Sequence, residues 1–428
     1  MPQPKRKCNP NLELIAKPSR RIVLPIEVED YKQCVQDSSA FREWVDAMYT
    51  QYPELFPDGF TEGYHLHDQR PSKKMPDVLT RRIRLRSTGT VYRVVPSFVL
   101  PYMTGYAADV EKALFLRRFG VPFWGLSYVF GRNDMYWQRL VAQLGRYDLV
   151  GTTVKDPDRL PEHLLADEKF TSMNGERIFV ATTVGDDVIL GAATSLRAQA
   201  KELTIAYDEF KTEATRLKPD YQPQTVNNDG WPATKQAWLT LFPTIFVIRC
   251  FLHAYLRIRD RCKSKPVFTE IRRMIWHIYH ARSHTTYWRR YRDFLAFARA
   301  HLQGEALKAV NKFEKKRAQL YKGWLYPGAH RVSTMLERHM QPMTRCLYMA
   351  RDFHGHRNTA HLLVRGWTLL HNFLPYCPRA RSPRICGKAP ATSFSPFHKL
   401  NQKQYRDCWL ENLLVATSCQ HEFFHQKR

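Results

Sequence analysis

Three acidic residues stand where predicted strands and a predicted helix could bring their carboxylates together. Asp167 lies in a predicted strand over 163–171, Asp229 ends a later predicted strand, and Glu337 lies in a predicted helix after a basic segment. Carboxylate oxygens are the ligands that suit Mg²⁺, and two such ions can clamp an in-line phosphoryl transfer. The residue types therefore predict a Mg²⁺ site, with Mn²⁺ as a substitute, that is formed by Asp167, Asp229 and Glu337.

Other acidic residues compete for these roles. Glu168 should point to the opposite face of the strand from Asp167, because side chains alternate along a strand. Asp186 and Asp187 fall between two predicted strands, which favours a role in a turn. The rivals for the third position lie in a basic aromatic segment and are Glu305 and Glu314.

The order of the predicted elements explains how the first two aspartates could meet. Between residues 163 and 249 the pattern reads β-β-β-α-β-α-β, which is the order of an RNase H-like core. In such a core the first and fourth strands are neighbours, so Asp167 and Asp229 should converge. A late helix can add Glu337. We therefore predict a multidomain α+β protein with an RNase H-like α/β core that an all-helical insertion interrupts.

The region upstream of this core has the pattern of a DNA-binding module. Arg82 to Val95 alternates between apolar residues and arginine, which predicts a β-hairpin with one basic face. Helices over 107–119, 123–130 and about 134–144 follow and fit a helix-turn-helix, although any small three-helix bundle fits as well. The side chains that we expect to contact DNA are Arg132, Asn133, Tyr136, Gln138 and Arg139.

The segment after residue 251 is helical in composition, basic and rich in aromatic residues. Aromatic rings can stack on unpaired bases, and arginine can hold phosphates. Trp288, Arg289 and Arg290 are the candidates for DNA contacts here. The alternative is that Trp288 belongs to the core of a helical bundle.

A Cys-x-x-His pair, Cys250 and His253, stands where a strand passes into a helix. No second pair of metal ligands accompanies it, so the spacing favours packing or hydrogen bonding to the acidic site over zinc binding. The nine cysteines are scattered without a Cys-x-x-Cys pair, which fits free thiols in a reducing compartment.

Composition limits the class of partner. The 428 residues carry 66 Lys and Arg against 40 Asp and Glu, a formal charge of +26, with 44% hydrophobic and 13% aromatic residues. That is too apolar for a disordered polybasic chain, and the charge argues for a polyanionic partner over a small metabolite. No stretch is apolar enough to predict a membrane span or a secretory signal.

The residues around the acidic positions resemble those of a known family. Asn227-Asn228-Asp229-Gly230-Trp231, then Phe242-Pro243, then Cys250 to His253, and finally Ser333 to Arg338 are similar to motifs of DDE transposases with a helical insertion, the Mutator-like and related insertion-sequence families. The resemblance covers about residues 160–372. It implies an enzyme that cleaves DNA at the ends of a mobile element and joins the 3′-hydroxyls to target DNA, and it implies the carboxylates as Mg²⁺ ligands.

The resemblance also implies partners and a location. We expect binding to the double-stranded terminal inverted repeats and to target DNA, with at least a homodimer on DNA and no membrane. The location would be the cytoplasm, at the nucleoid of a prokaryote, or the nucleus of a eukaryote. An RNase H-like nuclease or resolvase without strand transfer, and an inactive DNA-binding regulator, are the alternatives.

The expected parts of the chain follow from these assignments. They are a mixed N-terminal region (1–80), a hairpin with helix-turn-helix (81–150), the first part of the core (160–253), the helical insertion (254–323), the last part of the core (324–372) and a C-terminal basic tail (373–428).

Overall fold

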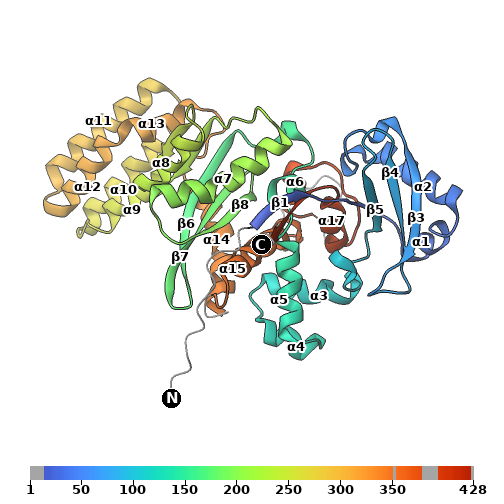
Figure 1. The fold of residues 1–428 in the computed structure, drawn as a ribbon. Helices are drawn as coiled ribbons and strands as arrows, with labels where there is room; N and C mark the ends of the chain where they lie inside the picture. The colour runs from blue at the N-terminus through green and yellow to red at the C-terminus, as the bar shows by residue number, and fades with distance from the viewer. Residues whose placement is uncertain (1–13, 350–352, 378–393, 426–428) are drawn as a thin grey trace, which may run out of the picture.

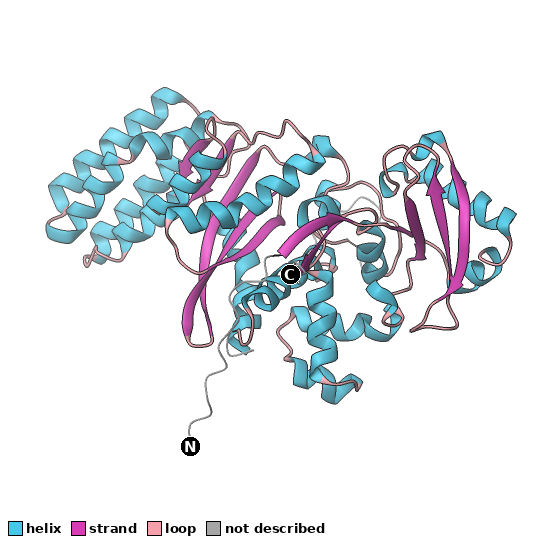
Figure 2. Ribbon diagram, viewed as in Figure 1, coloured by secondary structure: helices cyan, strands magenta, loops and turns pink. Residues whose placement is uncertain are grey.

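The computed structural model describes residues 14–349, 353–377 and 394–425. The chain is an α+β protein, as the sequence predicts, and the strands of the described residues form sheets of two, four and five strands (Figures 1 and 2). Among these residues, no helix is both long enough and apolar enough to cross a membrane.

A four-stranded sheet with two helices on one face forms the N-terminal part, at the right of Figure 1. The strand order is β2-β5-β4-β3, with β2 parallel to β5 and the other pairs antiparallel. Tyr31 and Phe41 of the helices are buried in the same cluster as Ile83 and Val94 of the strands. The bounds are β2 Arg21–Leu24, α1 Val28–Cys34, α2 Ser38–Gln51, β3 Tyr64–Pro71, β4 Leu79–Leu85 and β5 Val91–Pro96, with 3₁₀ turns at Pro53–Leu55 and Phe60–Glu62.

The predicted hairpin over 82–95 is confirmed as β4 and β5. However, β3 hydrogen-bonds to β4 and β2 to β5, so the hairpin is the middle of a sheet whose outer strands come from residues 21–71. The predicted boundary at residue 80 is therefore wrong. The reason is physical: alternation along a hairpin does not say which strands pair with its two outer edges.

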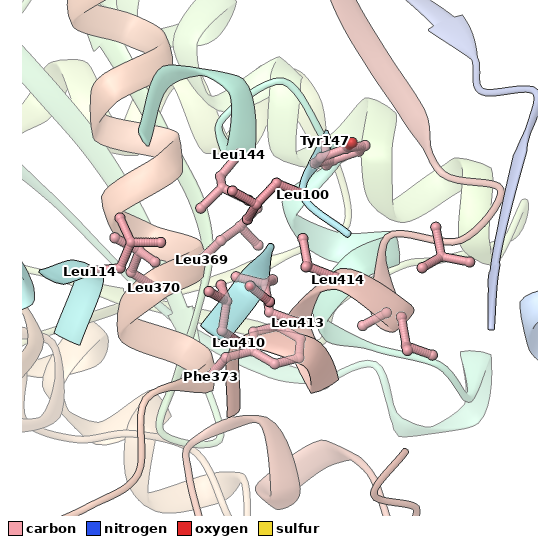
Figure 3. Close-up of a cluster of buried hydrophobic side chains, with 14 of the residues drawn as sticks. Leu100, Leu114, Leu144, Tyr147, Leu369, Leu370, Phe373, Leu410, Leu413 and Leu414 are labelled. Atoms are coloured by element: carbon pink, nitrogen blue, oxygen red, sulfur yellow. The ribbon is translucent and has the colours of Figure 1, made fainter. Parts of the chain in front are cut away.

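Three helices occupy the segments predicted for the helix-turn-helix: α3 Ala107–Arg118, α4 Phe123–Phe130 and α5 Asp134–Leu144. They share one apolar cluster with two later helices, α15 (Arg357–Phe373) and α17 (Trp409–Ala416). Figure 3 shows Leu114 of α3 and Leu144 of α5 in this cluster. A short helix, α6 (Leu149–Thr153), leads from them to the central sheet and is buried throughout. A 3₁₀ turn at Pro101–Met103 precedes them, and another at Pro157–Arg159 follows α6.

The predicted basic tail over 373–428 is wrong for residues 394–425. Leu410, Leu413 and Leu414 of α17 are buried in the cluster of Figure 3. The last strand, β11 (His421–His425), pairs antiparallel with the first, β1 (Leu14–Pro18). A short helix, α16, spans Phe397–Leu400. The prediction followed the basic composition of the segment, whereas its apolar residues complete a core that the other helices leave open.

The central sheet positions the acidic residues. Its order is β10-β9-β6-β7-β8, with β6, β7 and β8 antiparallel and β6, β9 and β10 parallel. Leu164 and Ala166 of β6 face a cluster with α7 and α8, whereas Leu165 faces a cluster with α14 and α15, so helices cover both faces. The bounds are β6 His163–Met173, β7 Glu176–Gly185, β8 Val188–Ser195, α7 Ala200–Leu217, β9 Thr225–Asn228, α8 Pro232–Leu241, β10 Phe246–Arg249 and α14 Thr334–Met349.

Between β10 and α14 the chain forms a block of helices with its own apolar cluster, at the left of Figure 1. The predicted helical insertion over 254–323 is confirmed as a run of helices. They are α9 Phe251–Arg259, α10 Lys265–Tyr279, α11 His284–His301, α12 Gly304–Lys315 and α13 Arg317–Leu325.

Candidate active site

The two aspartates meet because their strands are parallel neighbours. The ladder between β6 and β9 pairs His163 with Thr225 and Leu165 with Asn227. Asp167 lies two residues further along β6, and Asp229 follows the end of β9 directly. Continuing the same register makes the two aspartates neighbours on one face of the sheet, and the charge of Asp229 acts on Asp167. The prediction that the first and fourth strands are neighbours is confirmed.

The carboxylate of Asp167 is held at one oxygen, and so is that of Asp229. The backbone N–H of Glu168 donates to Asp167 Oδ1 at 2.8 Å, and the N–H of Trp231 donates to Asp229 Oδ1 at 2.7 Å. In the described part of the chain, Oδ2 of each aspartate accepts no hydrogen bond. These oxygens are thus available as ligands for a cation.

Glu337 reaches this edge of the sheet from α14, which packs on β6 and β7. Ser333, the residue before α14, donates a hydrogen bond from Oγ to Glu337 Oε1 at 3.0 Å. His253 Nε2 lies 3.8 Å from the same oxygen, and the Glu337 side chain is 45% exposed. The third carboxylate is therefore held on one side and open to solvent on the other.

Ser333 is also the partner of the Cys-x-x-His pair. Its N–H donates to Cys250 Sγ at 3.3 Å, its Oγ lies 3.3 Å from the same sulfur, and His253 Nδ1 lies 3.4 Å from that Oγ. Cys250 follows β10, and its register places it beside Asp229. The pair thus lies beside Glu337: both residues contact Ser333, and His253 also lies 3.8 Å from the carboxylate. This is the hydrogen-bonding role that the spacing favours.

Electrostatics link the acidic side chains. Burial, together with the negative charges of Asp229 and Glu337, raises the pKa of Asp167 to about 6, although the backbone hydrogen bond from Glu168 acts in the opposite direction. Burial alone would raise the pKa of Cys250, but its contacts with His253 and Ser333 lower the pKa of the thiol. The hydrogen bond with Cys250 raises the pKa of His253. The carboxylates repel one another, so a bound cation would relieve this strain.

The donor set fits Mg²⁺ in type, since three carboxylates offer hard oxygen ligands. Two of them also have an oxygen without a protein hydrogen bond. In residues 14–349, 353–377 and 394–425, no group of three or more His, Cys, Asp or Glu side chains is arranged closely enough to hold a metal ion as it stands. The hydrogen bond from Ser333 turns Glu337 toward His253.

The rival acidic residues have other partners. Glu168 faces the opposite side of the sheet and accepts hydrogen bonds from Tyr207 Oη at 2.7 Å and Thr234 Oγ1 at 2.8 Å; burial raises its pKa to about 7. Asp186 and Asp187 form the turn between β7 and β8, both with positive φ. Both observations agree with the prediction.

Asp187 also has a role that sequence reasoning missed. Its Oδ1 accepts from Arg338 at 2.5 Å and lies 2.9 Å from His339 Nε2, and both partners follow Glu337 on α14. The turn between two strands thus fixes the first half of α14 against the sheet, and with it the position of Glu337. No pattern within either segment indicates this contact.

The predicted DNA-contacting residues of α5 divide into two groups. Arg132, Asn133 and Arg139 are exposed. Arg132 stacks 5.3 Å above the ring of Tyr136, and Asn133 caps the helix by accepting from the N–H of Tyr136 at 2.8 Å. Gln138 is different: it is half-buried and lines a cavity of about 170 Å³ between α5, α14 and α15. Its side chain is thus less accessible than those of Arg132, Asn133 and Arg139, and its contact with DNA stays a prediction.

The residues predicted on α11 also differ in their surroundings. Trp288 is half-buried, with its ring 5.0 Å from that of Tyr321, and its Nε1 donates to His284 Nε2 at 3.1 Å. Arg290 donates to the carbonyl of His277 at 2.5 Å and so ties α10 to α11. Arg289 is exposed. Trp288 and Arg290 thus serve the packing of the helical block, which is the alternative noted for Trp288.

Besides the contacts of Asp187, two further features of the site were missed by sequence reasoning. Ser333 was visible only as part of a motif, and its contacts depend on β10 and α14 meeting. A basic groove beside Gly230 depends on the packing of α12 against α9.

No protein-family model matches this chain, and no curated protein aligns with it significantly.

Proposed function

We propose that this protein is a DDE-type DNA transposase, a metal-dependent enzyme that cleaves DNA strands at the ends of a mobile element and joins them to target DNA. The observation that carries the proposal is the register of β6 and β9, which makes Asp167 and Asp229 neighbours, with Glu337 beside them on α14.

The arrangement of the elements supports the same proposal. When the five strands of the central sheet are numbered along the chain, their spatial order across the sheet is 5-4-1-2-3. Strand 2 is antiparallel to strands 1 and 3, and strands 4 and 5 are parallel to strand 1. This is the strand order of an RNase H-like fold. A block of helices separates β10 from the helix with the third carboxylate, which is the organisation that the motif resemblance implies.

The roles of the residues follow from their contacts. Asp167, Asp229 and Glu337 would hold Mg²⁺, or Mn²⁺ in its place. Ions held there would supply Lewis-acid chemistry, both for an attacking water or 3′-hydroxyl and for the leaving oxygen. The backbone N–H groups of Glu168 and Trp231 fix the two aspartates, and Ser333 fixes Glu337. The formal charge of +26 allows the acidic pocket to approach a polyanion.

The experiment is strand cleavage with the purified full chain and a plasmid that carries the DNA flanking its gene. The cleavage rate should fall about 10²-fold or more in each of three variants, Asp167→Asn, Asp229→Asn and Glu337→Gln, because each substitution removes a charged ligand. Glu176→Gln, at the exposed tip of the β6–β7 hairpin, is the matched control and should cleave like the wild type. Cleavage without added metal in EDTA, or full activity of Glu337→Gln, would refute the assignment.

Strand transfer separates the two enzymatic alternatives. A pre-cut end with a free 3′-hydroxyl should become joined to target plasmid in the presence of Mg²⁺. Cleavage without joining would leave a nuclease or resolvase as the function. Binding without either reaction would leave a DNA-binding regulator.

A further inference from the structure

A groove with a cavity volume of about 480 Å³ opens next to Asp229, between the edge of the central sheet and the helical block. Gly230 and Arg249 line its end at the sheet, and α9 and α12 form its walls. Seven of its thirteen lining residues are Lys or Arg, and one, Glu305, is acidic. The groove is therefore a strongly positive concavity that begins one residue from a candidate catalytic carboxylate.

The positive side chains of the groove are largely free of acidic partners. Lys308 pairs with Glu305 on its own helix at 2.7 Å. Among the described residues, Arg249, Arg257 and Lys312 form no salt bridge and donate no side-chain hydrogen bond, although Arg249 lies close enough to Asp229, and Lys312 to Glu305, to interact electrostatically. Burial and the nearby charge of Arg257 lower the pKa of Arg249. A site that gathers unpaired, mutually repelling cations is stabilised by an anion.

The spacing of the cations suits a chain of phosphates. Lys308, Lys312 and Lys315 share one face of α12, because residues three and four apart are neighbours on a helix. At 1.5 Å per residue the row from Lys308 to Lys315 is about 10 Å long, which is long enough to contact more than one phosphate of the same strand. Small side chains, Ala254 and Ala309, lie between the charged ones and leave room for a backbone.

The size of the groove limits what can enter it. A volume of about 480 Å³ is that of a pocket for a small ligand. A whole duplex is far wider than such a pocket, whereas a single backbone can lie along it. Because the groove opens beside Asp229, its occupant would be continuous with a strand at the acidic site.

We propose that this groove binds the phosphate backbone of one unpaired DNA strand, the strand that runs away from the bond to be cleaved. The proposal rests on the proposed function for the identity of the site, but its binding test needs no cleavage. It assigns Arg249, Arg257 and Lys312 as strand-binding residues.

The test is binding of a fluorescent 12-nucleotide single strand in EDTA, measured by anisotropy from 50 to 200 mM salt. The variant Arg257→Ala/Lys312→Ala removes two phosphate contacts, so the salt slope should fall by about 1.4. If the variant and the wild type bind equally at 1 M salt, this change of slope makes the variant bind about 25-fold more weakly at 0.1 M salt. Both residues are exposed, so the fold should be retained.

The control variant is Arg272→Ala/Arg282→Ala, which removes the same charge from exposed positions of the helical block outside the groove. It should bind the single strand nearly as well as the wild type. Binding of a duplex should fall much less in the groove variant than binding of the single strand. Equal losses in the two variants, or equal losses for duplex and single strand, would overturn the proposal.

Two further arms complete the test. Inorganic tripolyphosphate should compete weakly; complete competition at a concentration equal in charge would mean that the groove takes free polyphosphate, and would overturn the strand proposal. If the wild type binds the strand through the groove but never cleaves DNA, the proposed function fails and the groove stands. If the wild type cleaves DNA and the groove variant binds like its control, the groove fails and the proposed function stands.

Discussion

Ser333 is the residue whose loss best tests how the third carboxylate is positioned. It is 3% exposed, and its hydroxyl contacts Glu337 at 3.0 Å, Cys250 at 3.3 Å and His253 at 3.4 Å. Ser333→Ala removes all of these contacts and adds no bulk. The helix that follows begins at the next residue and keeps its packing, so the change acts mainly on the orientation of Glu337.

The expected magnitude follows from the burial of the partners. A hydrogen bond to a charged group contributes about 1.5–3 kcal/mol. Glu337 is 45% exposed, and water replaces part of the contact, so the lower end of about 1.5 kcal/mol applies. If Glu337 must hold its orientation for the reaction, cleavage should slow about ten-fold, since 1.4 kcal/mol is a factor of ten. The loss of the contacts to Cys250 and His253 should lower the free energy of unfolding by about 1 kcal/mol.

The assay is single-turnover cleavage as a function of Mg²⁺ concentration, with urea unfolding measured in parallel. Ser333→Ala should need more Mg²⁺ for half-maximal rate, which a purely structural role would not change. Thr334→Ala, at the exposed neighbouring position, is the control and should leave both the rate and the Mg²⁺ requirement unchanged. Reduced stability with an unchanged rate and Mg²⁺ requirement would refute the reasoning.

Three other predictions concern the fold and the helices that we propose to bind DNA. Gly366→Ala should lower the free energy of unfolding by about 1–3 kcal/mol, because a Cβ there would lie 2.0 Å from the carbonyl oxygen of Val141. Gly125→Ala is the control and should lower it less, because the nearest atom there is a side-chain methyl at 3.2 Å. Similar unfolding curves for both variants would contradict the close crossing of α5 and α15. Hydrogen bonding to Arg82 lowers the pKa of Asp68 from 3.8 to about 2, so the stabilisation that the Asp68 carboxylate provides should be complete above pH 4 and disappear as the pH falls toward 2. Urea unfolding of Asp68→Asn should lack this part of the pH dependence. The effect should be smaller than about 1 kcal/mol, because the pair is near the surface. Arg139→Ala should weaken binding to the element ends more than to random DNA in a gel-shift titration, and an equal loss on both would make it a phosphate contact only.

The exposed surface of α4 shows which part of the helix-turn-helix region could be predicted from the sequence. Trp124, Tyr128 and Val129 are largely exposed on this short helix, and Met135 is exposed at the start of α5. The sequence places these residues on helices correctly, but their exposure depends on α3, α5 and α15 packing together on the other side. The number and order of the helices were predictable, whereas the face that remains free was not.

The sequence alone determined the types of the elements and the position of the acidic residues along them. Alternation predicts the strands of the central sheet, and the 3.6-residue period with caps such as Asn133 predicts α3 to α5 nearly to the residue. These signals are local, because they arise from the backbone geometry of a few neighbouring residues. Because such local signals place each strand along the chain, Asp167 could be assigned to the first strand of the central sheet and Asp229 to the end of the fourth.

Tertiary structure decided what each buried face packs against. The apolar residues of α17 could equally have formed a separate helix, but they complete a core with α3, α5 and α15. The neighbours of Ser333, the covered side of Gln138 and the groove at Arg249 all depend on segments distant in the sequence. Periodicity shows that a face will be buried but not which partner buries it, because that choice is made by complementary packing across the whole chain.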